Sequence, residues 1–282
     1  MNKIQMTACT IALGSVILAS LSQKSERQSI AATETPGKLT LVANGEDFVR
    51  KGFTSKDGWQ INFDLVYINI SEATAYSTNS SFEPHKGDTK SDIEYQDKVN
   101  LVNTAQTIDL AAGGESAPAI PITQADVAPN FYNALTWKLS TAPDNSPAAG
   151  STIALQGQAS KDGQRIDFKL GFNQPIEYIC GEFVGDERLG IVEATSPGKV
   201  EATLHFDHIF GDLDTPPEDA LNQDALGFQP FAQLASNGTL ELDEDSLSSQ
   251  LSSSQYQQLN DAVIGLGHVG EGHCVINTAV VN

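Results

Sequence analysis

The sequence predicts a mainly β fold, either a β-sandwich or a barrel-like domain, with a small helical C-terminal segment. Short segments in which apolar and polar side chains alternate recur from Lys38 onward, and glycine- or proline-bearing turns separate them. Strands do not alternate with long helical patterns, which disfavours an α/β fold. After Asp212 the apolar spacing becomes helical, so helices are expected there.

The first strands lie on either side of a turn at Lys56–Gly58. Leu39–Ala43 is short and apolar, whereas Trp59–Leu65 alternates between apolar and polar residues. Val66–Ile70 continues this strand, but its apolar residues alternate in the opposite phase and so lie on the other face of the strand. We therefore expect one long strand that changes face near its middle.

The later strand predictions share the same short alternating or apolar pattern. They cover Val99–Val102, Thr107–Ala111, Asn133–Leu139, Thr152–Gln158, Ile166–Leu170, Ile176–Phe183, Gly190–Ala194 and Val200–Asp207. Lys161–Gln164 contains Asp-Gly and predicts a tight hairpin turn. The proline-bearing segments 111–129 and 141–150 are expected to be loops.

Helical signals are confined to the C-terminal part of the chain. Pro217–Leu221 is typical of a helix start, Phe231–Ala235 indicates a short helix, and Ser254–Leu266 has the clearest helical spacing. Glycines at positions 265 and 267 are expected to end that helix. We therefore divide the chain into a β-sandwich domain over residues 38–212 and a mixed helical and loop segment over 213–282, packed on it.

The N-terminus is typical of an exported protein. Residues 1–22 combine Lys3 with an apolar run and are interpreted as a signal peptide, followed by a linker over 23–37. The apolar run is shorter than the about 20 residues of a membrane span, so cleavage is favoured over an uncleaved anchor. The mature protein is therefore expected in the periplasm or outside the cell, with no membrane attachment.

The charge balance limits the classes of partner. The chain has 36 acidic against 16 basic residues, for a formal net charge of −20. Nucleic acids and anionic membrane surfaces require basic patches, so both are disfavoured. Cations are the partners that this charge favours.

The cysteines permit one disulfide in the mature chain. If Cys9 leaves with the signal peptide, Cys180 and Cys274 remain, and an even pair in an oxidising compartment is most simply a disulfide. The alternative is that Cys274 is a thiolate ligand beside His273, which would favour copper or zinc over calcium.

Four of the five histidines fall in two short clusters that are far apart in the sequence. The first cluster contains His205, Asp207 and His208 at the end of a predicted strand. On that strand His205 and Asp207 share the polar face, about 6.5 Å apart, whereas His208 joins them only if the strand bends. The second contains His268, Glu271 and His273 in a glycine-rich loop after the last helix.

These two clusters predict a metal site assembled by folding. Imidazoles with one carboxylate suit copper(II) or zinc. A site dominated by Asp207, Asp212 and Asp214 would instead suit calcium. The fifth histidine, His85, lies in a polar loop and is expected to be merely exposed.

Three segments carry a resemblance to a known family. Asp64–Ser71, Phe131–Leu139 and Val200–Phe210 resemble the strand order of the MbnP-like domain, over about residues 38–212. That family comprises exported bacterial β-rich proteins associated with copper binding. The resemblance implies a periplasmic copper-binding protein and a partner di-haem peroxidase that acts on a tryptophan, for which Trp59 and Trp137 are the candidates.

Two other functions compete with metal binding. In the first, the chain is a structural or adhesive β-sandwich of the cell envelope whose histidines only satisfy hydrogen bonds. In the second it is a hydrolase, but the sequence contains no Gly-x-Ser-x-Gly, no His-Glu-x-x-His and no phosphate-cradling loop. An enzyme is therefore the least favoured class, and an exported copper- or zinc-binding protein is the favoured one.

Overall fold

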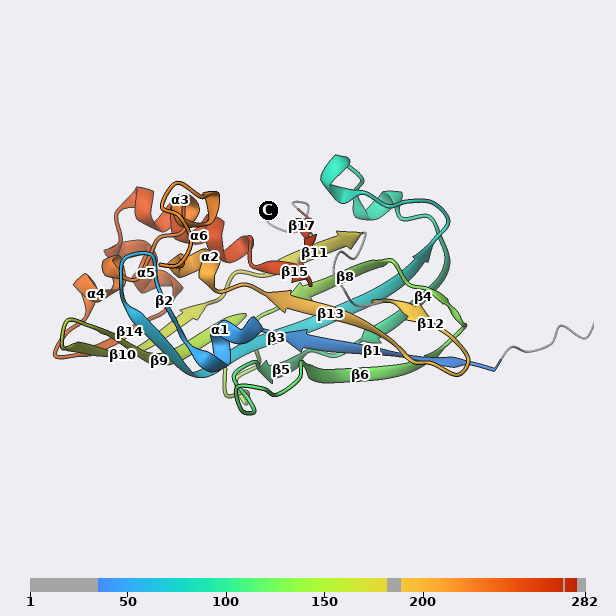
Figure 1. Ribbon diagram of the computed structural model, residues 1–282, viewed down its shortest axis with the longest axis horizontal. Helices are drawn as coiled ribbons and strands as arrows, with labels where there is room; N and C mark the ends of the chain where they lie inside the picture. The colour runs from blue at the N-terminus through green and yellow to red at the C-terminus, as the bar shows by residue number, and fades with distance from the viewer. Residues whose placement is uncertain (1–34, 182–188, 271, 278–282) are drawn as a thin grey trace, which may run out of the picture. The chain divides into compact units, whose positions relative to one another are not determined.

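The computed structural model describes residues 35–181, 189–270 and 272–277, which all belong to one compact unit (Figure 1). Two large β-sheets make up most of this unit, so the predicted mainly β class is confirmed. Apolar side chains from both sheets, such as Leu41, Val200, Ile68 and Trp137, belong to a single hydrophobic core. Burial of these side chains is the main force that holds the two sheets together.

The larger sheet has ten strands and is built around β3 (Gln60–Thr78). The strands that pair with β3 are β9 (Ile153–Lys161) and β8 (Ala134–Leu139) on one edge, and β2 (Phe53–Thr54), β5 (Gln106–Asp109) and β4 (Tyr95–Val102) on the other. The sheet continues through β10 (Gln164–Phe172), β14 (Thr239–Leu242), β11 (Ile176–Gly181) and β17 (Val275–Ile276). The β3–β9 register shifts between Phe63 and Leu65, which confirms the predicted change of face.

The hairpin between β9 and β10 forms as predicted. Asp162 and Gly163 have φ angles of 49° and 81°, as a two-residue type I′ turn requires. Lys161 pairs directly with Gln164 across this turn.

The smaller sheet has five strands. Its order is β16 (Gly272–His273), β15 (Gly267–Val269), β13 (Gly198–Leu204), β1 (Gly37–Asn44) and β6 (Ile120–Val127). Its strands β13, β15 and β16 lie at the two predicted histidine clusters. Strand β6 lies within the segment that was predicted to be a loop, so that prediction is wrong for residues 120–127. Pro121 suggested a loop, but β6 is an edge strand, where a missing N–H is tolerated. A two-stranded sheet of β7 (Asn130–Phe131) and β12 (Ile191–Val192) completes the unit.

Most helix lies after Asp212, as predicted. Among the described residues before position 200, the longest helix is α1 (Glu46–Lys51), and the others are the short 3₁₀ turns η1 (Pro84–Lys86) and η2 (Lys90–Asp92). The later helices are α2 (Asp207–Phe210), α3 (Ala220–Asp224), α4 (Gln229–Leu234), α5 (Glu244–Gln250) and α6 (Ser253–Ile264). A capping box between Ser252 and Gln255 begins α6.

The segment after Asp212 also adds strands to both sheets. β14 and β17 join the larger sheet, and β15 and β16 join the smaller one. No helix in the described part of the chain is both long and apolar enough to cross a membrane. The predicted signal peptide (residues 1–22) lies outside the described residues, as does most of the predicted linker (23–37).

Candidate metal centre

Strand β13 places the first histidine at the site. Its apolar residues Val200, Ala202 and Leu204 are buried, as the alternation predicts. The face predicted to be polar and exposed is also covered: Glu201 and Thr203 are 7% and 0% exposed, and Glu201 accepts a hydrogen bond from Asn44 at 2.8 Å. β13 ends at Leu204, so the expectation that the strand continues through Asp207 is wrong.

A tight turn replaces the end of the predicted strand. The backbone N–H of His205 donates to the carbonyl of Leu266 at 3.1 Å, and that of His208 donates back to the carbonyl of His205 at 3.2 Å. α2 begins at once and ends at Gly211, whose φ of 68° suits glycine. This is the bend on which the inclusion of His208 depended, and it turns His208 toward His205.

The second cluster forms a short β-hairpin in place of the expected loop. β15 pairs antiparallel with β13, with His268 opposite Thr203, and β16 places His273 opposite His268. Gly267 allows this approach because a Cβ there would lie 2.3 Å from a ring carbon of Tyr178. The two histidine clusters therefore meet at the end of β13.

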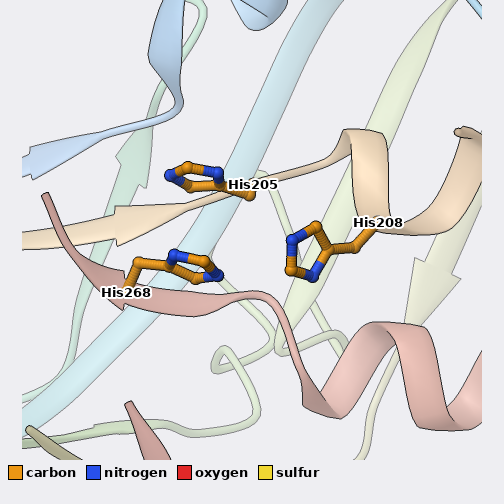
Figure 2. A group of neighbouring side chains, drawn as sticks. All are labelled: His205, His208 and His268. Carbon is orange, nitrogen blue, oxygen red and sulfur yellow. The ribbon is translucent and has the colours of Figure 1, made fainter. Parts of the chain in front are cut away.

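Three imidazoles converge at this meeting point (Figure 2). His205, His208 and His268 each offer a ring nitrogen, and these three atoms all lie within 4.8 Å of one another. We call these three side chains the histidine group. The rings of His205 and His268 are stacked, with centroids 4.0 Å apart and planes 10° apart, and His208 reaches them from the side with its centroid 5.1 Å from that of His268.

The ring nitrogens of the histidine group are poorly satisfied. His268 is 2% exposed, and neither of its ring nitrogens has a hydrogen-bond partner among the described residues. His205 Nε2 is buried and likewise lacks a hydrogen bond in this part of the chain, although Glu46 Oε1 lies 3.9 Å away. His208 hydrogen-bonds the backbone of Gly265, which leaves its other nitrogen as an acceptor.

The surroundings keep these imidazoles neutral. Burial, followed by repulsion from His208 and His273, lowers the pKa of His205 to about 4. Burial and then the neighbouring His205 lower the pKa of His268 further. Burial also lowers the pKa of His208 and of His273. At neutral pH the ring nitrogens therefore present lone pairs, which is the state that a metal ion requires.

The remaining predicted ligands lie at different distances from this group. His273 is exposed, with its ring centroid 4.1 Å from that of His268 and 5.7 Å from that of His208. Asp207 is buried as the first residue of α2 and is not one of the described side chains whose ligand atoms converge. Glu271 lies outside the described residues. Asp212 hydrogen-bonds the backbone of Asp214 within its own loop.

The cysteines form the predicted disulfide. Cys180 and Cys274 are bonded, which ties β11 to the residue after His273. The alternative in which Cys274 is a thiolate ligand is therefore wrong for this structure, because its sulfur is already bonded.

Sequence reasoning missed two neighbours of the site. Glu46 begins α1 with a φ of 58°, and its carboxylate lies 3.9 Å from His205 Nε2; no local pattern indicated this contact. His85 is exposed, as expected, but its Nε2 lies 2.7 Å from the carbonyl oxygen of His273. The rarity of histidine in the chain was the only signal that could have connected His85 with the others.

Comparison of the chain with protein-family models, with curated proteins and with solved structures returns no match. The two tryptophans that the MbnP-like resemblance singles out are both buried: Trp137 is 0% exposed and Trp59 is 2% exposed. Trp137 packs against Tyr178 with ring centroids 4.3 Å apart, and Tyr178 in turn contacts Gly267.

Proposed function

We propose that this chain is an exported protein that binds one copper or zinc ion through His205, His208 and His268. The observation on which the proposal rests is His268, an almost fully buried imidazole with no hydrogen bond at either nitrogen among the described residues. A buried polar group that only supports the fold is normally paired. Two further imidazoles beside it supply the donors that a metal site needs.

The type of donor supports the choice of metal. The three converging atoms are neutral imidazole nitrogens, which suit copper and zinc, whereas calcium binds through oxygen atoms. Three histidines leave one position of a tetrahedral zinc site open. His273 is the nearest further imidazole that could fill it.

Binding requires a small rearrangement of the rings. Ligand nitrogens lie about 2 Å from zinc or copper, so two of them are at most about 4 Å apart. The three ring nitrogens of the histidine group lie within 4.8 Å of one another, which is slightly more than this limit of about 4 Å. In addition, the lone pairs of the parallel, stacked rings of His205 and His268 do not point at a common position. We therefore expect His205 or His268 to turn about its side-chain bonds when the ion binds.

Export and family membership remain parts of the same proposal. The disulfide supports an oxidising compartment, and the N-terminal sequence pattern supports secretion. The resemblance to the MbnP-like domain favours copper over zinc and adds a di-haem peroxidase as the proposed partner.

Equilibrium titration of the purified, metal-free chain with Cu²⁺ and with Zn²⁺ tests the proposal. We expect one ion per chain, and we expect His205→Ala and His268→Ala to weaken affinity by at least 100-fold. His85→Ala is the matched control, because it removes an imidazole outside the histidine group. A wild-type chain that binds neither ion would favour the structural or adhesive β-sandwich.

A further inference from the structure

A cavity of about 890 Å³ opens beside the histidine group. His208 and His273 line it on one side, and residues of α3 and α6 line the rest. Both histidines contact the ring of His268, with centroids 5.1 Å and 4.1 Å from it. The cavity is therefore lined by two side chains that contact His268, whose ring nitrogens lack partners among the described residues.

The lining of this cavity is acidic. Asp219, Asp224 and Asp261 contribute to it, and no lysine or arginine is among the described residues that line it. Lys56 lies near Asp224 but donates to the backbone carbonyls of Asn222, at 2.7 Å, and Ala225, which hold its ammonium group in place. The cavity thus presents a negative field on the path to His208.

The two stacked rings of the histidine group have little exposed surface. The side chain of His205 is 12% exposed, and His268, which lies on β15, is 2% exposed. His273, by contrast, is exposed at the mouth of the cavity. The cavity lined by His208 and His273 therefore offers an ion an approach to the group that does not require β15 to unfold.

We infer that this cavity is the loading route for the cation, in which Asp224 and Asp261 concentrate a hydrated divalent metal ion before the histidines take it up. The inference rests on the proposed metal-binding function. The net charge of −20 attracts cations to the whole surface, but an acidic concavity with low-dielectric walls focuses the field locally. We therefore expect these two carboxylates to raise the rate at which the ion binds. This effect should depend on their position in the cavity and not only on the net charge of the protein.

The test compares the loading rates of charge-matched variants. Stopped-flow mixing with Cu²⁺, followed by quenching of tryptophan fluorescence, measures association in the wild-type chain, in Asp224→Asn/Asp261→Asn, and in Glu115→Gln/Asp144→Asn. Both double variants remove two exposed carboxylates, but Glu115 and Asp144 do not line the cavity. We expect the cavity pair to slow loading about tenfold at low salt and to flatten its salt dependence, and the control pair to change it less than about twofold.

A second pair of variants keeps the acids and adds a positive charge. Gln257→Lys places an ammonium group on the cavity wall, and Ser248→Lys places one on α5 away from it; both positions are exposed. We expect only Gln257→Lys to slow loading. This comparison does not require the carboxylate variants to fold.

The outcomes separate this inference from the proposed function. If the wild-type chain binds no ion at equilibrium, the proposed function fails and the inference fails with it. If it binds one ion but the cavity variants load as fast as their controls, the metal site stands and the loading route is refuted. Slower loading in the cavity variants, with one ion still bound per chain, supports the route.

Discussion

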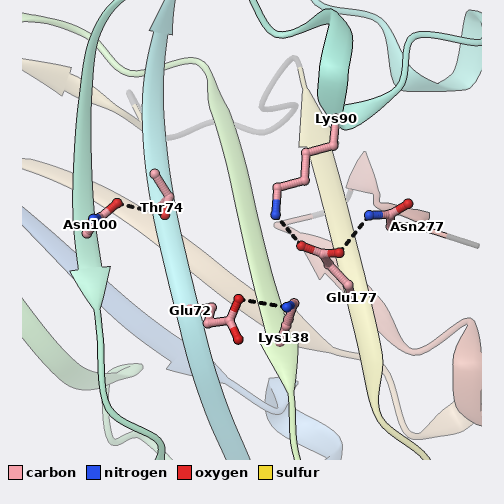
Figure 3. A network of polar contacts seen from close by, with 7 residues as sticks. All are labelled: Glu72, Thr74, Lys90, Asn100, Lys138, Glu177 and Asn277. Carbon is pink, nitrogen blue, oxygen red and sulfur yellow. Dashed lines mark hydrogen bonds and ion pairs between the residues drawn. The ribbon is translucent and has the colours of Figure 1, made fainter. Parts of the chain in front are cut away.

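Two buried polar regions of the molecule, one on β11 and one at the end of β13, differ in how their polar atoms are satisfied. Near β11, the carboxylate of Glu177 is almost fully buried, with one oxygen paired to Lys90 and the other accepting from Asn277 at 2.6 Å (Figure 3). The backbone N–H of Asn277 also donates to the carbonyl of Glu177 at 2.8 Å. Together with the Cys180–Cys274 disulfide, these residues form what we call the C-terminal anchor.

In the histidine group, His268 is as deeply buried as Glu177, at 2% exposed, but it lacks such pairing. His268 has no hydrogen bond at either ring nitrogen among the described residues, and His205 Nε2 has none either. The anchor shows that this fold pairs a buried charge when the charge serves structure. Trp137 Nε1 is also unpaired among the described residues, but His268 has both ring nitrogens unpaired beside two further imidazole nitrogens, which favours a ligand over packing.

Removing the disulfide should have the largest effect on stability. Cys180→Ser/Cys274→Ser opens a covalent link across 94 residues, so the unfolded chain gains conformational freedom. We expect the free energy of unfolding to fall by about 4 kcal/mol in guanidinium titrations of the metal-free protein. A loss below about 1 kcal/mol would show that the anchor does not depend on this bond.

Neutralising Glu177 should have the next largest effect. Glu177→Gln leaves Lys90 without its buried partner. Because the Lys90 side chain is 38% exposed, we expect the free energy of unfolding to fall by about 2 kcal/mol, which is less than the full penalty for breaking a buried pair. Glu72→Gln is the matched control, because Glu72 also pairs with a lysine, Lys138, but its own side chain is 59% exposed (Figure 3). Equal losses in the two variants would contradict the distinction between buried and exposed pairs.

Acidification should destabilise the metal-free protein through its histidines. The pKa of His205 is lowered to about 4 in the folded state, against about 6.5 in an unfolded chain. Between these values the unfolded chain binds more protons, so the free energy of unfolding falls as the pH falls. We expect His205 alone to lower the free energy of unfolding by about 1 to 2 kcal/mol between pH 7 and pH 5, and the other histidines with lowered pKa values to add to this loss, read from denaturant midpoints. An unchanged midpoint would mean that the group protonates freely when folded.

Removing the unpaired imidazole should cost the metal-free protein little. His268→Leu keeps a side chain of similar size and removes two unsatisfied nitrogens, so we expect the free energy of unfolding to stay constant or to rise by up to about 1 kcal/mol. The same variant should lose the rise in melting temperature that metal gives the wild type. A loss of about 2 kcal/mol or more without metal would identify His268 as a structural residue.

The smallest effect is expected for His85→Ala. His85 is exposed, and its Nε2 lies 2.7 Å from the backbone carbonyl oxygen of His273. We expect a stability change below about 0.5 kcal/mol and metal affinity within about twofold of wild type. A tenfold loss of affinity would show that His85 positions His273.

The sequence predicted those parts of the fold and site that depend on local pattern. Alternation in β3, the Asp-Gly hairpin and the capped helix α6 each follow from a few neighbouring residues. The proximity of His205 and His268 was expected from their concentration in two clusters, and their stacking confirms that the clusters meet.

The features that the sequence did not predict depend on contacts between distant segments. β6 is a strand because it pairs with β1, and β14 is a strand because it pairs with β10. The turn after Leu204 is held by Leu266, 62 positions later, and this contact turns His208 into the group and takes Asp207 out of the predicted strand face. The approach of Glu46 to His205 likewise depends on the parallel pairing of β1 with β13, in which Asn44 lies opposite Thr203.

The proposed histidine site is best tested by a crystal structure of the protein with one equivalent of zinc, with anomalous data collected on either side of the zinc edge. We expect one anomalous peak about 2 Å from nitrogens of His205, His208 and His268, with the rings of His205 and His268 no longer parallel. A peak held by other side chains, or no peak beside three rings that remain stacked, would contradict it.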